Sequence, residues 1–351
     1  MSLDIGGLPV GDRQPLFVIA ELGLNHGGSL ERALAMVDAA AAAGASAVKV
    51  QTFKAEELVA AHCPAPAHVS AGSLREFFRQ FEFDRAAHVE IATRAKLHGL
   101  AFVATPFSSA SIDMLVDIGV DALKIASGDL TYDQLIADSA QTGLPVIIST
   151  GMSTLAEAAH AVSVARGAGA AQLVLLHCVS AYPVLEGSQN LRGIQTLRRV
   201  FGTHVGLSDH FRDASAVPVA VALGASVYER HFILPGDDGV DRDVSSTPEQ
   251  LAEIVTIARR TQAALGHGRR ECLASEAVNL TASRRALHTT RSLSPGDVIT
   301  ADDLVALRPS RGLPPNLKDE LVGTTVGRTI EAGAPLLGQD LPNTRSHRGV
   351  A

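Results

Sequence analysis

The feature that most constrains the fold is a regular alternation of short apolar runs with segments of helical pattern. The apolar runs fall at 16–20, 47–51, 100–104, 122–126, 146–149, 173–177, 205–207 and 227–230. Helical patterns lie near 84–98, 109–118, 131–142, 154–168, 190–200, 213–223 and 248–265, and Ser29 can cap another helix. Short runs that are apolar on both faces are typical of parallel strands covered by helices. Eight such units within the first 265 residues favour a closed (β/α)8 barrel, the TIM-barrel form of the α/β class.

A doubly wound open sheet is the alternative for an alternating α/β chain. That fold usually carries a glycine-rich phosphate fingerprint directly after its first strand. Here the first apolar run leads into E-L-G-L-N-H-G-G, whose glycines have the wrong spacing for that fingerprint. The barrel is therefore the better interpretation.

The composition changes after Gly266, and a second, smaller domain is expected there. Two stretches, 291–304 and 328–341, align without gaps as R-S-L-S-P-G-D-V-I-T-A-D-D-L and R-T-I-E-A-G-A-P-L-L-G-Q-D-L. Each has a turn glycine, a short strand and an Asp-Leu ending, which predicts two related hairpin-like units. We expect a barrel domain over 1–266, a linker over 267–283 and a β-rich domain over 284–351.

Composition narrows the class of protein. A net charge of −7 and the lack of a basic stripe argue against a nucleic-acid partner. The three cysteines, Cys63, Cys178 and Cys272, are too few and too widely spaced for a disulfide framework. We see no signal-peptide pattern, and no apolar stretch reaches the roughly 20 residues that span a bilayer. We therefore expect a cytoplasmic protein without a membrane partner.

Polar residues follow the end of every predicted strand. In a barrel, the working residues lie at the carboxyl ends of the strands, so these side chains should meet at one rim. Two lysines, several hydroxyls and a glycine-flanked turn suit a small anion such as a phosphate or a carboxylate. The rim residues are Glu21, Asn25, His26, Lys49, Gln51, Thr105, Lys124, Ser127, Asp129, Ser149, Thr150, His177, Ser180, Tyr182, His210 and His231.

Two of these residues, His210 and His231, end consecutive predicted strands. Adjacent parallel strands would place both imidazoles side by side, where they could share one metal ion. The alternative for each is a hydrogen-bonded structural histidine. For Lys49 and Lys124, the alternative to anion binding is an ion pair with an acid across the barrel, because an unpaired buried ammonium is costly.

Nucleophilic catalysis finds no support in the sequence. The chain has no G-x-S-x-G motif and no P-loop. Cys178 follows His177 directly, so on a strand the two side chains would point to opposite faces, and we expect Cys178 in the core. For the hydroxyls of Thr105, Ser127 and Ser149, ordinary backbone capping is the alternative to ligand binding.

The barrel region carries eight ordered motifs that resemble those of the sialic acid synthase family. They are E-L-G-L-N-H-G-G, V-K-V-Q-T, A-T-P-F, L-K-I-A-S-G-D, I-S-T-G-M, L-L-H-C-V-S-A-Y-P, G-L-S-D-H and E-R-H-F. The C-terminal repeat resembles the antifreeze-like (SAF, β-clip) domain of that family, so the resemblance spans nearly the whole chain. The family makes N-acetylneuraminate and related nine-carbon keto acids.

The resemblance implies that phosphoenolpyruvate condenses with the aldehyde of an open-chain N-acetylated aminohexose, typically N-acetylmannosamine, and that phosphate leaves. A divalent metal, Mn²⁺ or Mg²⁺, would polarise the aldehyde oxygen. By matching motif positions, His210 and His231 would bind this metal. Glu21 and Asp129 would be catalytic. The phosphoenolpyruvate ligands would be Lys49, Thr105, Lys124, Ser127, Ser149, Ser180 and Tyr182. The sugar ligands would be Glu21, Gln51, Asp129, Asp241 and Arg308.

The resemblance also implies a domain-swapped homodimer, because Arg308 matches a family arginine that reaches into the barrel of the partner subunit. Two departures concern the sugar: many N-acetylneuraminate synthases have Glu at the position of Asp129 and Asn at that of Ser180. Synthases of legionaminic acid, pseudaminic acid or a spore-coat sugar therefore stay open as alternatives. A different metal-dependent barrel aldolase or keto-acid synthase, and a non-catalytic carbohydrate-binding protein, are the remaining alternatives.

Overall fold

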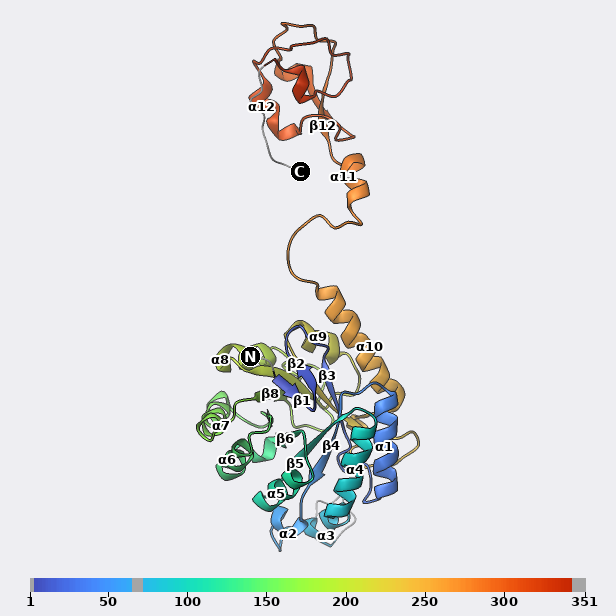
Figure 1. Ribbon diagram of the computed structural model, residues 1–351, viewed down its shortest axis with the longest axis vertical. Coiled ribbons are helices and arrows are strands. Elements are labelled where there is room, and N and C mark those ends of the chain that lie inside the picture. The colour runs from blue at the N-terminus through green and yellow to red at the C-terminus, as the bar shows by residue number, and fades with distance from the viewer. Residues whose placement is uncertain (1–2, 65–71, 343–351) are drawn as a thin grey trace. The chain divides into compact units, whose positions relative to one another are not determined.

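The chain is known from a computed structural model that describes residues 3–64 and 72–342, and it divides into two compact units, 1–266 and 267–351. The first unit contains a closed barrel of eight parallel strands, because β10 pairs with both β9 and β3. The predicted (β/α)8 barrel is confirmed (Figure 1). Its strands are β3 (Phe17–Glu21), β4 (Ala47–Thr52), β5 (Ala101–Pro106), β6 (Ala122–Ile125), β7 (Val146–Ser149), β8 (Leu173–Cys178), β9 (His204–Asp209) and β10 (Val227–Phe232).

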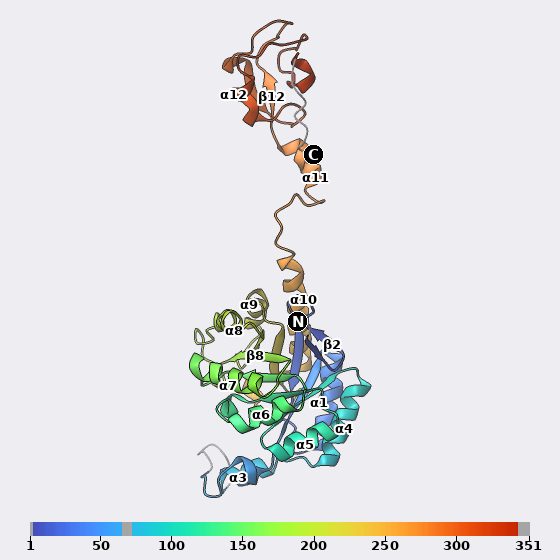
Figure 2. The same cartoon turned by 60° about the vertical axis from the view of Figure 1, so that its left-hand side comes forward.

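Helices surround the barrel on its outside, as Figure 2 shows. They are α1 (Leu30–Ala42), α4 (Arg85–Leu97), α5 (Ser109–Asp117), α6 (Asp133–Gln141), α7 (Leu155–Gly167), α8 (Gly193–Phe201), α9 (Ala216–Ala222) and α10 (Pro248–Leu265). Side-chain caps fix several of their starts: the Ser29 hydroxyl accepts from the Arg32 N–H at 3.2 Å, as the sequence predicted. Within 3–64 and 72–342, no helix is long and apolar enough to cross a bilayer.

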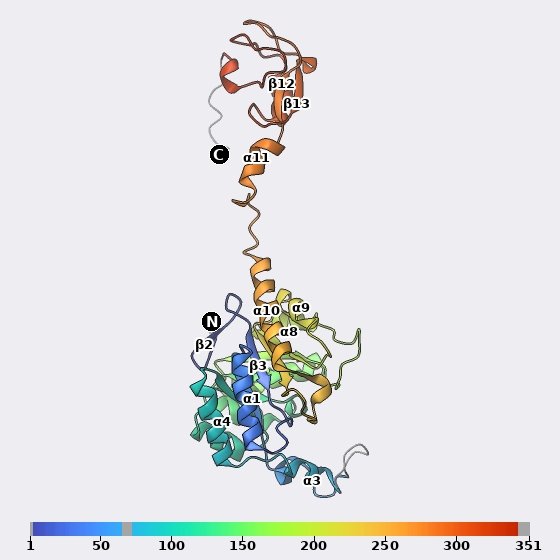
Figure 3. The same cartoon turned by 90° about the vertical axis from the view of Figure 1, so that its right-hand side faces the viewer.

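One end of the barrel is sealed by an N-terminal hairpin that the sequence analysis did not predict. Strands β1 (Leu3–Ile5) and β2 (Leu8–Val10) pair antiparallel. Leu3, Ile5 and Val10 pack against the inward-facing side chains at the start of the barrel strands, such as Phe17 and Ile147. Helices α2 (Ala55–Leu58) and α3 (Leu74–Arg79) lie at the opposite end of the barrel (Figure 1, Figure 3). The hairpin therefore leaves the carboxyl rim as the end where ligands can enter.

The insertion after β4 builds a small aromatic cluster beside that rim. Phe53, Phe81 and Leu24 form its buried centre, with Phe78 and Phe107 packed against them. The Phe53 ring lies 5.6 Å from that of Phe78 and 5.9 Å from that of Phe107, both edge to face. Residues 65–71, between α2 and α3, fall outside the described part of the chain.

In the second unit, α11 (Ala277–Ser283) falls in the predicted linker, and β12 (Ala286–Thr289) pairs antiparallel with β13 (Leu304–Leu307). The two sequence repeats meet at Leu293 and Ile330, whose N–H groups each donate to the other's carbonyl at 2.9 Å. The sequence repeat is thus also a structural repeat. The remaining elements of this unit are short: η3 (Ala301–Asp303), η4 (Pro315–Leu317), α12 (Lys318–Leu321) and η5 (Gly338–Asp340).

Candidate active site

The carboxyl ends of the barrel strands enclose a cavity of about 260 Å³. It forms because strand residues alternate in direction, so that on β10 both Glu229 and His231 face inward while Arg230 faces outward. Predicted residues that line the cavity are Glu21, Lys49, Gln51, Thr105, Lys124, Ser127, Ser149, Ser180, Tyr182, His210 and His231. The structure thus brings eleven of the predicted side chains together at one rim.

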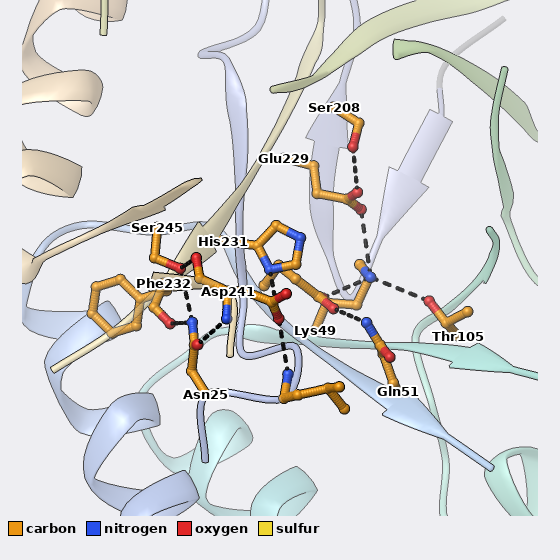
Figure 4. Close-up of polar contacts among 12 residues, drawn as sticks. Asn25, Lys49, Gln51, Thr105, Ser208, Glu229, His231, Phe232, Asp241 and Ser245 are labelled. Carbon is orange, nitrogen blue, oxygen red and sulfur yellow. Dashed lines mark hydrogen bonds and ion pairs between the residues drawn. The ribbon is translucent and has the colours of Figure 1, made fainter. Parts of the chain in front are cut away.

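Lys49 lies among two carboxylates and a hydroxyl, as Figure 4 shows. Its Nζ is 2.6 Å from Glu21 Oε2 and 3.8 Å from Glu229 Oε2, and it donates to Thr105 Oγ1 at 3.2 Å. Burial alone would lower the pKa of Lys49, but the charges of Glu21 and Glu229 outweigh it and raise the pKa. Lys49 is therefore part of an ion pair, as the alternative to anion binding predicted, and this ion pair lies inside the cavity.

Lys124 differs, because it has no carboxylate within ion-pair distance among the described residues. Its Nζ donates only to the carbonyl of its neighbour Ile125, at 2.9 Å. The side chain is buried, and burial lowers its pKa. The nearby Ser149 Oγ is buried and lacks a hydrogen-bond partner in the described chain. A cation and a hydroxyl with unused bonding capacity suit an anionic ligand.

A tight turn after β7 completes this anion side of the cavity. The Gly151 N–H donates to Ser127 Oγ at 3.0 Å. A Cβ at Gly151 would come within 2.2 Å of Ser180 Oγ and 2.7 Å of Ser127 Oγ, so only glycine lets the two hydroxyls approach so closely. The turn of the S-T-G-M motif after β7 therefore brings together the Ser127 and Ser180 hydroxyls, which follow β6 and β8.

On the other side of the cavity, the rings of His210 and His231 have centroids 5.4 Å apart. His210 Nδ1 lies 3.1 Å from the Val179 carbonyl oxygen, and His231 Nδ1 lies 3.3 Å from Asp241 Oδ2. The second contact is an ion pair without hydrogen-bond geometry. Each Nδ1 thus faces an oxygen behind the ring, and this leaves the Nε2 of both rings for a ligand in the cavity. Histidines that bind metals show this second contact.

The pKa values of the two histidines shift in opposite directions. Burial lowers the pKa of His210 to about 3, and a positive charge on His231 adds to the effect. Burial also acts to lower the pKa of His231, but Asp241 and Glu21 together outweigh it and raise the pKa. Neutral His210 is therefore ready to donate a lone pair, whereas a cation bound at this place would compete with a proton for His231.

Asp241 is held beside His231 by its own contacts (Figure 4). Its Oδ2 accepts from the Leu24 N–H at 3.2 Å, and its backbone N–H donates to Asn25 Oδ1 at 2.9 Å. Gly23 has a φ of +52°, and a Cβ there would lie 2.6 Å from Asp241 Oδ2. The E-L-G-L-N motif therefore positions Asp241, a role that explains why Asn25 is buried away from the cavity wall.

The described chain contains no group of three or more His, Cys, Asp or Glu side chains that could hold a metal ion. The donor set at the rim is thus the histidine pair. A hard cation such as Mg²⁺ keeps several waters and also takes ligands from its substrate, so two protein ligands can be enough.

Several predicted site residues do not line the cavity. Asp129 lies half-buried on η1 (Ser127–Asp129), where burial raises its pKa. His177 points away, with its Nε2 2.8 Å from the Gln189 carbonyl oxygen. Arg308 belongs to the second unit, where it is exposed at the end of β13. Cys178 is buried, as expected of a core residue, and its thiol also lines the cavity, 3.8 Å from His210 Nδ1.

Sequence reasoning left out two polar side chains of the cavity, Ser208 and Glu229. The Ser208 hydroxyl donates to Glu229 Oε1 at 2.8 Å. Burial would raise the pKa of Glu229, but the charges of Lys124 and Lys49 outweigh it and lower the pKa to about 2. The signal was available: each residue lies two positions before one of the histidines, and that spacing puts it on the same strand face.

Two buried lysines, two buried carboxylates and a histidine pair at the carboxyl rim place the chain among barrel proteins with a polar site at that end, suited to a small anionic ligand. Comparison with known proteins then identifies the family. Residues 36–270 match the NeuB family and residues 284–342 match the SAF domain. The chain therefore belongs to the NeuB family of synthases, and both the predicted resemblance to sialic acid synthases and the predicted SAF domain are confirmed.

Relatives of known name make different acids. The chain is 35% identical over 346 residues to the N,N'-diacetyllegionaminic acid synthase of Legionella pneumophila, covering 95% of this chain and 96% of the relative. It is 32% identical over 332 residues to a pseudaminic acid synthase of Campylobacter jejuni, covering 93% and 96%. A crystal structure of the N-acetylneuraminic acid (sialic acid) synthetase from Leptospira borgpetersenii superposes with a TM-score of 0.71 at 36% identity, covering 80% of this chain and 95% of that one.

Proposed function

We propose that this protein condenses phosphoenolpyruvate with an open-chain N-acetylated aminohexose, giving a nine-carbon keto acid of the sialic acid type and phosphate. The observation that carries the proposal is the division of one cavity into two sides. Lys124 and Ser149 offer unused bonding capacity for an anion, and His210 and His231 line the same cavity. An anionic donor and an aldehyde acceptor can therefore lie side by side.

Different residues of the cavity would bind phosphoenolpyruvate and the sugar. Lys49, Lys124 and the hydroxyls of Thr105 and Ser149 would bind the phosphate and carboxylate of phosphoenolpyruvate. Gln51 donates to Glu21 Oε1 at 3.2 Å, so Gln51 would orient Glu21 toward the sugar. The remaining predicted ligands, Ser127, Ser180 and Tyr182, line the same cavity.

The atoms balance as follows. C3 of phosphoenolpyruvate forms a bond to the aldehyde carbon, and the aldehyde oxygen takes a proton to become a hydroxyl. Water adds at C2 and provides that proton in net terms, and the C2–O bond then breaks to release phosphate. The buried carboxylate of Glu21 would hold or move the proton at the aldehyde oxygen, and Asp129 would act from the edge of the site.

The histidine pair fits a divalent cation, Mn²⁺ or Mg²⁺. His210 and His231 would hold it through Nε2, with Val179 and Asp241 fixing the two rings from behind. When bound, the cation supplies a Lewis acid for the aldehyde oxygen. We expect a chelator to abolish turnover, and His231→Ala to lose metal-dependent turnover while it still folds. Wild-type rates for this variant in the presence of chelator would overturn the metal assignment.

The experiment that tests the function is phosphate release from phosphoenolpyruvate in the presence of Mn²⁺ and a panel of sugars. We expect release only with an N-acetylated aminohexose, and N-acetylmannosamine is the first acceptor to try. A hexose with two acetamido groups is the second, because the Legionella relative is named as an N,N'-diacetyllegionaminic acid synthase. A panel of such sugars that gives no phosphate would overturn the proposal.

We also propose a cytoplasmic, domain-swapped homodimer in which Arg308 reaches the sugar in the other subunit's barrel. Two inactive variants, Arg308→Ala and His231→Ala, test it when mixed and allowed to exchange subunits. A swapped heterodimer would have one site with both residues intact, and a random mixture would regain about a quarter of wild-type activity. If Arg308 acted within its own chain, no heterodimer site would combine both residues, and no activity would return.

A further inference from the structure

The outward face of β10 carries a buried arginine directly beside His231. Arg230 is 2% exposed, and because strand residues alternate it points away from the cavity, into the layer between barrel and helices. A guanidinium in such a layer is costly unless its donors are paired. An aliphatic side chain would fill the same space without this cost, so the arginine needs an explanation.

The contacts of Arg230 join the segments that carry the two histidines. Its Nη1 donates to the carbonyl oxygens of Asp209, at 3.4 Å, and of Phe211. These two residues flank His210 in the chain. Its Nε donates to Ser246 Oγ at 3.0 Å, and Ser246 lies on β11 (Ser245–Ser246), which pairs with β10 at Phe232. One side chain on the His231 strand therefore fixes the backbone on both sides of His210.

Asp209 strengthens this arrangement from the same side. Its Oδ2 lies 3.6 Å from Arg230 Nη1 and accepts from the Tyr228 hydroxyl at 2.5 Å. Its Oδ1 accepts from the Phe211 N–H at 2.9 Å. The turn that carries His210 is thus held from behind by two buried charges. On the cavity side, His210 Nδ1 contacts the Val179 carbonyl oxygen at 3.1 Å and the Cys178 thiol at 3.8 Å.

We propose that Arg230 is a positioning residue that sets the geometry of the His210–His231 pair, and with it the affinity of the pair for a divalent cation. The inference rests on the proposed function, because it takes the two histidines as the metal ligands. Groups behind metal ligands typically change metal affinity by about 10- to 100-fold when they are mutated.

The test compares Mn²⁺ binding by full-length variants in the absence of substrates, with titration calorimetry and the EPR signal of free Mn²⁺. We expect Arg230→Met to bind Mn²⁺ about 10- to 100-fold more weakly than wild type. Arg230→Lys should fall between them, because an ammonium lacks the planar fork that reaches several acceptors. Binding of phosphoenolpyruvate should change much less, since its proposed ligands Lys49, Thr105, Lys124 and Ser149 lie on β4 to β7 and Arg230 contacts none of them.

Phe232→Leu is the matched control. Phe232 is also buried on the outward face of β10, and it is adjacent to His231, but its side chain makes no hydrogen bond to 209–211. We expect this variant to lower the melting temperature and keep Mn²⁺ affinity within about twofold, because packing is lost without the backbone contacts.

Two results would overturn the inference. One is wild-type Mn²⁺ affinity in both Arg230 variants, and the other is a loss in Phe232→Leu as large as that in Arg230→Met. If Arg230→Met does not fold, Arg230→Lys decides the question alone. If wild-type protein binds no Mn²⁺, the proposed metal role fails and the positioning role fails with it. If wild type and the Arg230 variants bind equally, only the positioning role fails.

Discussion

The buried carboxylates of the two units differ in how many of their oxygens accept hydrogen bonds. In the C-terminal unit, Asp303 Oδ2 accepts from the N–H and the hydroxyl of Thr300, at 2.9 and 2.8 Å, and Oδ1 accepts from Arg291 at 2.6 Å. Asp340 repeats this pattern with the Leu337 N–H at 2.7 Å and with Arg328. Both oxygens of each aspartate are therefore fully used within the protein.

In the barrel unit, one oxygen of each cavity glutamate has no hydrogen bond among the described residues. Glu21 Oε2 and Glu229 Oε2 face Lys49 at 2.6 and 3.8 Å, but neither contact has hydrogen-bond geometry. Native proteins rarely leave buried polar atoms unsatisfied, and the exceptions collect at functional sites. The carboxylates of the small unit are thus saturated within the protein, whereas those in the barrel cavity keep bonding capacity that a ligand could use.

The largest expected effect tests the barrel side of this comparison. Lys124→Met should lower kcat/KM by about 10³-fold, because it removes a positive charge from the proposed anion site. Its melting temperature should change little, since the lysine has no carboxylate within ion-pair distance in the described chain. Phosphate release and calorimetry on the same preparations measure both quantities.

Lys96→Met is the matched control for that variant. Lys96 is exposed on α4, where it donates only to the Gly119 carbonyl oxygen at 3.1 Å. It should keep both activity and stability, as most surface substitutions do. An active but strongly destabilised Lys124→Met protein would contradict the assignment of Lys124 to ligand binding.

The sequence predicted the barrel well because its periodic pattern records the fold directly. Short strands apolar on both faces, alternating with helices, leave few other architectures. It did not predict the hairpin of β1 and β2, because two three-residue strands are too short to show a period. Long-range packing holds the hairpin at the barrel, through the side chains of Leu3, Ile5 and Val10.

The site was predictable to the level of strand ends, but the direction of single side chains was not. On β8 the sequence offers His177 and Cys178 in succession, and only the register decides which one faces the cavity. In the structure Cys178 faces it and His177 does not. Asp241 was predicted only from the resemblance to the family. Its loop is brought to His231 by contacts with Leu24 and Asn25, and no periodic pattern in the sequence encodes these contacts.

The next variant is expected to destabilise the barrel without changing any residue at its carboxyl rim. Ile5→Ala should lower the free energy of unfolding of the barrel unit by about 3 kcal/mol, because it leaves a cavity where a fully buried side chain packed. Activity per folded molecule should not change, since the hairpin lies at the opposite end from the site. Urea unfolding and phosphate release measure the two effects. Leu97→Ala, at a position that is 78% exposed, is the control.

A smaller loss is expected when a saturated carboxylate is removed. Asp340→Ala should destabilise the C-terminal unit by about 2 kcal/mol, because the Leu337 N–H and Arg328 lose their acceptor. Asp302→Ala, at an exposed neighbour of the equivalent position, should have almost no effect. The measurement is thermal unfolding of the full chain. Equal midpoints for Asp340→Ala and wild type would show that saturation of this carboxylate contributes nothing to stability.

The smallest expected effect is a pH dependence of stability. It is caused by Asp303, which has in the first repeat the place of Asp340 in the second. The hydrogen bond from Arg291, followed by that from the Thr300 N–H, lowers the pKa of Asp303 to about 2. An unfolded aspartate has a pKa of about 3.9, so the folded form binds the proton more weakly. The stability that Asp303 contributes is therefore complete above about pH 4 and is lost as the pH falls toward 2. The difference in melting temperature between wild type and Asp303→Asn should shrink over that range. A difference that stays constant with pH would mean that the Arg291 contact does not favour the charged carboxylate.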